Sequence, residues 1–294
     1  MKKNKFITLS LALSLAVFPS LPSASSEATV DLQDNSAHVG HSLPKAEFKG
    51  KQEFDSPSFV EQSSVAEVLD EKGQKKKDKR IEKSKEKKKD KEKKDDKETS
   101  ELFGLFGDGG GSDSGSGDTS TTADRTVTVL VAVDEEYRAA NPDWQTLTQN
   151  IVEKADDAFM RDHGIDFQIQ AFAEWSSQGN DAVEILQDLE RDWDGRGYDF
   201  VAGFTKDANF NSGGIAYVYS SSPSGSAISV NLDQGAQNTA YAAQHEFSHN
   251  YGLGHAPQGS GIKCIMNYDY AYQVDYWHQE HDDEIQAHKT WYGN

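Results

Sequence analysis

The chain has 294 residues, which is enough for one sizeable domain with additional segments. It contains 49 Asp and Glu against 30 Lys and Arg, so its formal net charge is −19 at pH 7. From residue 124 onward there are 27 acidic and 9 basic residues, and this excess argues against a nucleic-acid partner because phosphate binding needs basic side chains. The single cysteine excludes an internal disulfide, so folding must depend on core burial and on metal binding.

Residues 1–26 have the pattern of a secretory signal peptide: a basic start, an apolar stretch over residues 6–18, and small residues suited to cleavage near Ala24. The apolar stretch is too short for a stable membrane span, and a retained membrane anchor is the alternative interpretation. We therefore expect a secreted, extracellular protein, without stable membrane insertion after cleavage.

Residues 27–100 are polar, and residues 72–97 consist mainly of Lys, Asp and Glu. Such a segment buries too little apolar area to offset its ordering entropy, so the sequence predicts a disordered pro-region. The lysine-rich run is either a plain spacer or a means of attachment to an anionic cell-wall polymer. Residues 101–123 add a short apolar patch and a flexible Gly/Ser linker.

A folded domain is expected over residues 124–294. β-Branched and apolar residues predict a buried strand over residues 126–133, and an alternating pattern predicts a second strand over residues 166–175. Between them, Asn141 and the proline that follows it start a helix that ends at Gly164. Asn180 is a suitable N-cap for the next helix, which continues to about residue 193.

Three more strands follow, over residues 198–204, 214–220 and 226–232. A helix over residues 237–251 comes next, and its small residues permit close packing beneath a sheet. A final helix is expected over residues 277–291. Strands and helices in this order predict an α+β domain.

The helix over residues 237–251 carries the start of HEFSHNYGLGH, which fits the pattern H-E-x-x-H-x-x-G-x-x-H. His245 and His249 are four residues apart and share one helix face, where both imidazoles can bind one ion. Gly252 permits the sharp left-handed turn that brings His255 back as a third ligand. Three protein ligands leave zinc one tetrahedral position for water, which is typical of a catalytic site. Glu246 lies beside this site without being a ligand.

The motif is followed by CIMNY at residues 264–268. Together these segments resemble the metzincin clan of zinc metalloendopeptidases, and about 170 residues are similar to reprolysin-like or astacin-like catalytic domains. The resemblance implies a twisted, mostly parallel five-stranded sheet with one antiparallel edge strand, an active-site helix, a Met-turn and a C-terminal helix. It implies one catalytic zinc ion on the three histidines, with Met266 as a support beneath it and Tyr268 associated with it.

The resemblance extends to the strand that lies along the substrate cleft of reprolysin-like members. Its counterpart here consists of Gly214, Ile215, Ala216, Tyr217 and Val218. Unpaired backbone groups on such an edge bind an extended polypeptide as an additional strand. This predicts a polypeptide substrate and cleavage of internal peptide bonds.

Astacin-like pro-regions contain an F-x-G-D segment whose aspartate binds the zinc. Residues 105–108 are similar, with Leu in place of Phe. Asp108 is therefore a candidate latency residue of a zymogen. The alternative interpretation is an apolar patch ahead of a linker, with no role in latency.

On this interpretation Glu246 is the general base, which takes a proton from a zinc-activated water and returns it to the leaving amine. Tyr268 either donates to the oxyanion or packs as an ordinary turn residue. The pocket for the side chain after the scissile bond is expected between residues 266 and 276, and it includes Tyr270, Tyr272 and Val274. We expect the enzyme to be a monomer.

Two other functions remain open alternatives: a secreted, zinc-containing binding or adhesion module without turnover, and an amide hydrolase of peptidoglycan cross-links. Further metal binding is also open. Residues 192–199 place oxygen donors as a Ca2+ loop does, although a tight helix-to-strand turn explains the same residues. His278, His281 and His288 fit either a second metal site or a solvated polar helix face.

Overall fold

The structure is a computed structural model, and it describes residues 39–47, 66–76 and 122–294. The signal peptide expected at residues 1–26 and the candidate latency residue Asp108 lie outside these ranges, so both stay predictions. Within the described ranges, no helix is long and apolar enough to cross a membrane.

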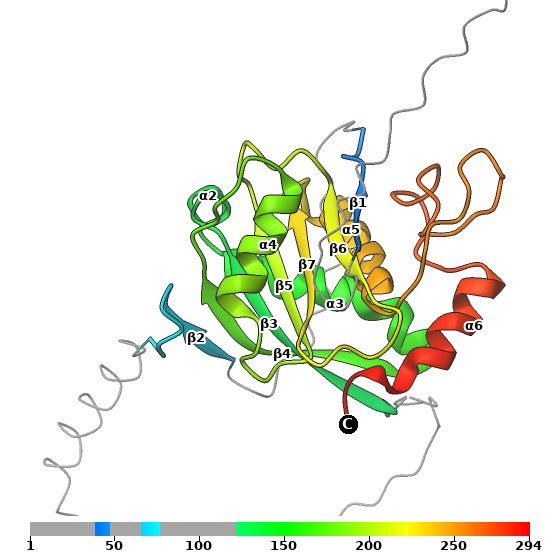
Figure 1. Ribbon diagram of the computed structural model, residues 1–294, viewed down its shortest axis with the longest axis horizontal. Helices are drawn as coiled ribbons and strands as arrows, with labels where there is room; N and C mark the ends of the chain where they lie inside the picture. Colours follow the sequence, from blue (N-terminus) through cyan, green and yellow to red (C-terminus); the bar gives the residue numbers. More distant parts are fainter. Residues whose placement is uncertain (1–38, 48–65, 77–121) are drawn as a thin grey trace, which may run out of the picture.

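A seven-stranded sheet forms the centre of the domain, in the order β1-β6-β7-β5-β3-β4-β2 (Figure 1). Five strands correspond to those predicted: β3 (Arg125–Val133), β4 (Ile165–Glu174), β5 (Phe200–Thr205), β6 (Gly214–Val218) and β7 (Ala227–Leu232). Neighbours among β3, β4, β5 and β7 pair in parallel, whereas β6 pairs antiparallel with β7. The predicted α+β fold with a mostly parallel sheet is confirmed.

Two further strands extend the sheet from five to seven. β1 (Val39–Leu43) pairs antiparallel with β6, and β2 (Glu67–Leu69) pairs in parallel with β4. Both come from residues 27–100, for which the sequence predicts no regular structure, and that prediction is wrong at these two strands. Their own sequences are too short and polar to indicate strands. Each is stabilised by the unpaired backbone groups at an edge of the sheet.

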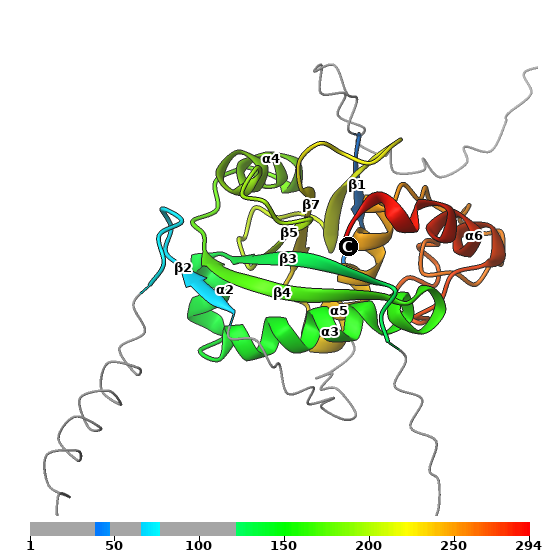
Figure 2. The same ribbon diagram turned by 90° about the horizontal axis from the view of Figure 1, so that it is seen from below.

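Helices cover both faces of the sheet. α4 (Ala182–Trp193) lies on one face, and α3 (Trp144–His163) and α5 (Ala236–Asn250) lie on the other (Figure 2). α5 contacts β6, β7 and α3. The small residues predicted to allow this close approach are all buried: Ala240, Ala242 and Ala243.

Two helix starts differ from the sequence prediction. An additional helix, α2 (Glu135–Ala140), is capped by Asp134, whose side chain accepts a hydrogen bond from the backbone N–H of Tyr137. Asn141 is the C-cap of α2 rather than the N-cap of the next helix, and α3 begins at Trp144. Asp181, rather than its neighbour Asn180, caps α4. Asn and Asp have similar N-cap preferences, so local sequence does not choose between adjacent candidates.

Aromatic packing fixes α5 on the sheet. Phe247 stacks on Phe167 of β4 with ring centroids 5.1 Å apart and 9° between the ring planes. It also meets Phe200 of β5 edge to face. Phe247 lies between His245 and His249 in the sequence and on the opposite side of the helix. Its burial therefore determines the direction in which the two histidines point.

The chain ends in α6 (Gln279–His288) and the 3₁₀ turn η1 (Lys289–Trp291), where the sequence predicts one helix. Nδ1 of His288 lies 2.6 Å from the backbone oxygen of Tyr251. The hydroxyl of Tyr292 donates to the backbone oxygen of Asn250, also at 2.6 Å. Carbonyls at the C-terminal end of a helix lack partners within the helix, so these contacts stabilise the end of α5.

Candidate active site

Three histidines converge at the C-terminal end of α5. His245 and His249 lie one turn apart on the helix, and His255 returns after a turn at Gly252, whose φ is 94°. Nε2 of His255 lies 3.2 Å from Nε2 of His245 and 2.9 Å from Nε2 of His249. The structure thus brings together the three residues that the motif predicts to meet.

Hydrogen bonds determine which nitrogen of each ring carries the proton. Nδ1 of His245 lies 2.8 Å from the backbone oxygen of Ile265, and Nδ1 of His249 lies 2.7 Å from that of Leu253. A carbonyl oxygen only accepts, so both Nδ1 atoms are protonated and both Nε2 atoms carry a lone pair.

Tyr268 determines which nitrogen of His255 carries the proton. The hydroxyl of Tyr268 donates to the backbone oxygen of Ser42 at 2.8 Å and lies 3.2 Å from Nδ1 of His255. Because the hydroxyl proton is donated to Ser42, the hydroxyl oxygen can only accept a hydrogen bond from the N–H at Nδ1 of His255. Nε2 of His255 then also carries a lone pair.

Three lone pairs that face one another repel unless a cation lies between them. Nitrogen ligands at about 2.0–2.1 Å from a tetrahedral zinc ion are separated by roughly 3.3–3.4 Å. The observed separations to His255, 3.2 and 2.9 Å, are close to this spacing. Protonated Nδ1 atoms bonded to oxygen are also the usual outer support of histidines that bind metal. The donor set therefore fits zinc.

Burial keeps these rings in the neutral form. It lowers the pKa of His245 to about 4 and that of His255 to about 2. The pKa of His249 is well below its usual value, first because of burial and then because of the neighbouring histidines. Neutral imidazole is the form that binds a metal ion, so the site is ready to bind at neutral pH.

Glu246 lies beside the histidines and is fully buried. Burial raises the pKa of its carboxyl group well above the usual value. Neither carboxylate oxygen has a hydrogen-bond partner within the described part of the chain. Burying a carboxyl group without a hydrogen-bond partner costs free energy of folding. Acids whose pKa values are strongly shifted are concentrated at functional sites.

The Met-turn supports the site from the other side. Met266 is fully buried, and its backbone oxygen accepts from the N–H of Ala256 at 2.9 Å, directly after His255. The preceding residue, Ile265, supplies the carbonyl that orients His245. The turn therefore contacts the segments of two of the three histidines.

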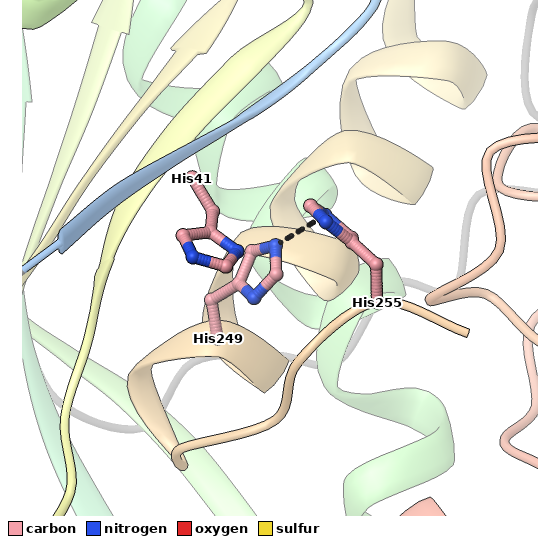
Figure 3. A group of neighbouring side chains, drawn as sticks. All are labelled: His41, His249 and His255. Carbon is pink, nitrogen blue, oxygen red and sulfur yellow. Dashed lines mark hydrogen bonds between the residues drawn. The ribbon is translucent and has the colours of Figure 1, made fainter. Parts of the chain in front are cut away.

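The edge strand expected to be open for substrate is covered. β6 (Gly214–Val218) is paired along all five residues with β1, because the polar segment before the domain reaches the cleft. His41 of β1 lies with its ring centroid 5.1 Å from those of His249 and His255 (Figure 3). The sequence does not identify His41 as a site residue, since a single histidine in a polar segment has no distinguishing pattern.

The acidic residues of the predicted calcium loop bind different partners in the structure. Asp194 accepts from the N–H of Ser226, whereas Asp199 accepts from the N–H and hydroxyl of Thr128. These separate partners favour the turn interpretation of residues 192–199 over a calcium loop.

The histidines of the last helix do not act as one group. His288 stacks on Trp291, away from His278 and His281. Those two residues lie instead with the buried Cys264.

The active-site helix, the converged histidines and the Met-turn define a metzincin-type zinc metallopeptidase domain. Residues 123–278 match the family model Reprolysin_5, described as metallo-peptidase family M12. This match includes more than half of the chain, and the chain belongs to metallopeptidase family M12.

No curated protein matches the chain. A solved structure described as "Structure of a chaperone-substrate complex" is similar with a TM-score of 0.43 and 12% identity. That similarity covers 59% of this chain and 36% of the other, so this chain spans about a third of the other chain's length.

Proposed function

We propose that this protein is a secreted zinc endopeptidase that hydrolyses internal bonds of polypeptides. The main observation is that Nε2 of His245 and Nε2 of His249 both lie within 3.2 Å of Nε2 of His255, with the buried carboxyl group of Glu246 next to His245 in the sequence. Secretion through residues 1–26, and synthesis as a zymogen with residues 27–123 as its pro-region, are parts of this proposal.

His245, His249 and His255 would hold the zinc ion. When bound, zinc supplies a Lewis acid that makes water a stronger acid and polarises a substrate carbonyl. Glu246 takes the proton of the attacking water and transfers it to the leaving amine. The Tyr268 hydroxyl, which now donates to Ser42, donates to the developing oxyanion once a substrate replaces that residue.

The course of residues 39–47 supports internal cleavage. The described segment begins before His41 and continues after it, along a cavity of about 510 Å³ lined by Pro44, Asn238 and Tyr272, among others. A chain can therefore enter the site from one side and leave it on the other. An enzyme that removes single terminal residues closes one side of its cleft.

The test is chelator-sensitive proteolysis by the full-length chain. The zinc-loaded chain is incubated with casein, both untreated and after brief treatment with a protease that cuts after lysine within residues 72–97. We expect internal fragments of casein that disappear with a chelator and return with added zinc. A zinc-bound chain that leaves casein intact in both forms would favour a binding module. Release of peptidoglycan cross-links alone would favour the amide hydrolase.

A further inference from the structure

Residues 39–47 lie in the cleft in the way expected of a substrate. We propose that this segment is a built-in inhibitor, in which His41 supplies a fourth nitrogen to the metal site and Leu43 occupies the substrate side-chain pocket. The proposal rests on the peptidase function above and adds its regulation and its substrate class.

Backbone pairing places the segment on one wall of the cleft. β1 runs antiparallel to β6, with Val39 opposite Val218 and Leu43 opposite Gly214. The pairing continues past the strand, where the N–H of Gly213 donates to the backbone oxygen of Leu43 at 2.7 Å. An extended polypeptide that adds to a sheet edge makes the same kind of bonds. Substrate and segment therefore compete for one set of backbone groups.

Side chains of the opposite wall bind the same segment. The hydroxyl of Tyr268 donates to the backbone oxygen of Ser42, and that of Tyr272 to the backbone oxygen of Pro44, both at 2.8 Å. The side-chain oxygen of Gln234 accepts from the N–H of Ala46 at 2.6 Å. All these contacts are to the backbone, as expected of a site that binds many peptide sequences.

His41 is positioned to close the metal site. Alternate residues of a strand share a face, so His41 and Leu43 both point toward α5. One ring nitrogen each of His41, His249 and His255 lie within 4.8 Å of one another (Figure 3). Zinc accepts four ligands, and a catalytic site leaves one position for water. A fourth imidazole at that position excludes the nucleophile.

Leu43 reports on the pocket for a substrate side chain. It is fully buried and packs against Ala242 of α5 and Ala271, with Tyr268 and Tyr272 at its border. The two alanines leave space for an aliphatic side chain of about the size of leucine. The proposed substrates are therefore polypeptides with Leu or a similar aliphatic residue at this position. Of the residues expected to shape this pocket, Tyr272 borders it, whereas Val274 packs against the main core.

The test compares the full-length wild-type chain with His41→Ala and with the control Ser42→Ala. Ser42 is exposed, and its contact with Tyr268 is through the backbone, so its substitution leaves the segment in place. We expect His41→Ala to hydrolyse casein at least tenfold faster than wild type without any added protease. Ser42→Ala should remain as slow as wild type.

A spectroscopic measurement separates this proposal from the peptidase function. In the cobalt-loaded wild type, a small hydroxamate should leave the visible spectrum unchanged because the metal is closed. In cobalt-loaded His41→Ala it should shift the spectrum. A shift of equal size in both proteins, with equal activity, overturns the inhibitor. An open metal in His41→Ala without any hydrolysis supports the inhibitor and contradicts the peptidase.

The products of a mixed peptide library test the role of Leu43 separately. Products formed by His41→Ala from a mixed peptide library should show Leu or another aliphatic residue enriched at one fixed position beside the cleaved bond. Enrichment of charged residues there, or no enrichment, contradicts the role given to Leu43.

A separate observation concerns Cys264, His278 and His281, which lie away from the cleft segment. One potential ligand atom of each lies within 4.8 Å of the others. Sγ of Cys264 lies 3.4 Å from Nδ1 of His281, and the rings of His278 and His281 have centroids 4.3 Å apart. Cys264 is fully buried and His281 is 7% exposed. We infer that these three side chains form a second metal site.

The donor chemistry favours zinc. Thiolate and imidazole together select zinc among the abundant divalent ions. Ligands at about 2.3 Å for sulfur and 2.0–2.1 Å for nitrogen are roughly 3.5 Å apart around a tetrahedral ion, close to the observed 3.4 Å. Nδ1 of His278 is buried without a hydrogen-bond partner in the described ranges. An ion here links the residue two before Met266 to the start of α6.

Metal content and cobalt spectra test this second site. We expect two zinc ions per wild-type chain and one in each of Cys264→Ala and His281→Ala. The cobalt-loaded wild type should show a thiolate-to-cobalt charge-transfer band, which the three-histidine site cannot produce. Cys264→Ala should lose this band and keep the bands of the other ion. One zinc per wild-type chain and no thiolate band would mean that Cys264 and His281 only share a hydrogen bond.

Discussion

Replacing Glu246 by glutamine is expected to reduce casein hydrolysis about 10²–10⁴-fold, the range for loss of a general acid–base group. Glutamine has nearly the same shape, so it fits the buried position, but it cannot take up the proton of the attacking water. The zinc content should not change, because Glu246 is not one of the proposed zinc ligands. The measurement is kcat/KM on a peptide substrate together with zinc per chain, both after removal of the inhibitory segment.

A matched control for this variant is Glu153→Gln on α3. Burial raises the pKa of Glu153 to about 7, so this control also neutralises a partly buried glutamate, but outside the site. It should keep nearly full activity. A rate above about a tenth of wild type in Glu246→Gln would contradict the assignment of Glu246 as the proton acceptor.

Gly214→Ala is expected to lower kcat/KM by about tenfold to a hundredfold, since a displacement of roughly 1 Å at a reacting group has an effect of this order. A Cβ atom at Gly214 would lie 2.5 Å from Oε1 of Glu246 and 2.8 Å from its Cγ. The side chain of Glu246 can move aside, so the cost is a displaced carboxylate rather than an unfolded protein. Zinc content and melting temperature should therefore stay close to those of wild type.

The matched control is Gly254→Ala. Gly254 lies just before His255, yet a Cβ there would meet nothing within 4 Å, and its φ is not in the left-handed region. This substitution should leave kcat/KM within about twofold of wild type, as for a surface change that disturbs no packing. If Gly214→Ala were as active as Gly254→Ala, the carboxylate would not depend on the close approach of β6.

Pairing of β1 with the edge of β6 affects association with other chains as well as latency. An exposed sheet edge presents unpaired N–H and C=O groups that can pair with other chains. In the described structure β1 occupies this edge. The same contact therefore protects the edge from unwanted pairing and withholds it from substrate. Release of the segment exposes the edge only when the enzyme becomes active.

Features that depend on neighbours along the chain can be predicted from the amino-acid sequence. His245, His249 and His255 lie within eleven residues, and helical spacing with a turn at Gly252 is enough to predict that they meet. The buried strands and the active-site helix follow from their periodic apolar patterns. Local sequence does not fix the helix starts, because adjacent residues such as Asn180 and Asp181 are equally good caps.

The distant residues that complete these local features cannot be predicted in this way. Ser42 and Tyr268, which bond across the cleft, are 226 positions apart, and no pattern in either segment identifies the other as its partner. Cys264 and His281 likewise come together through the packing of the Met-turn against α6. β1 acquires its structure from pairing with β6 rather than from its own sequence. The physical reason is that such contacts depend on surfaces that exist only after the sheet and α5 have formed.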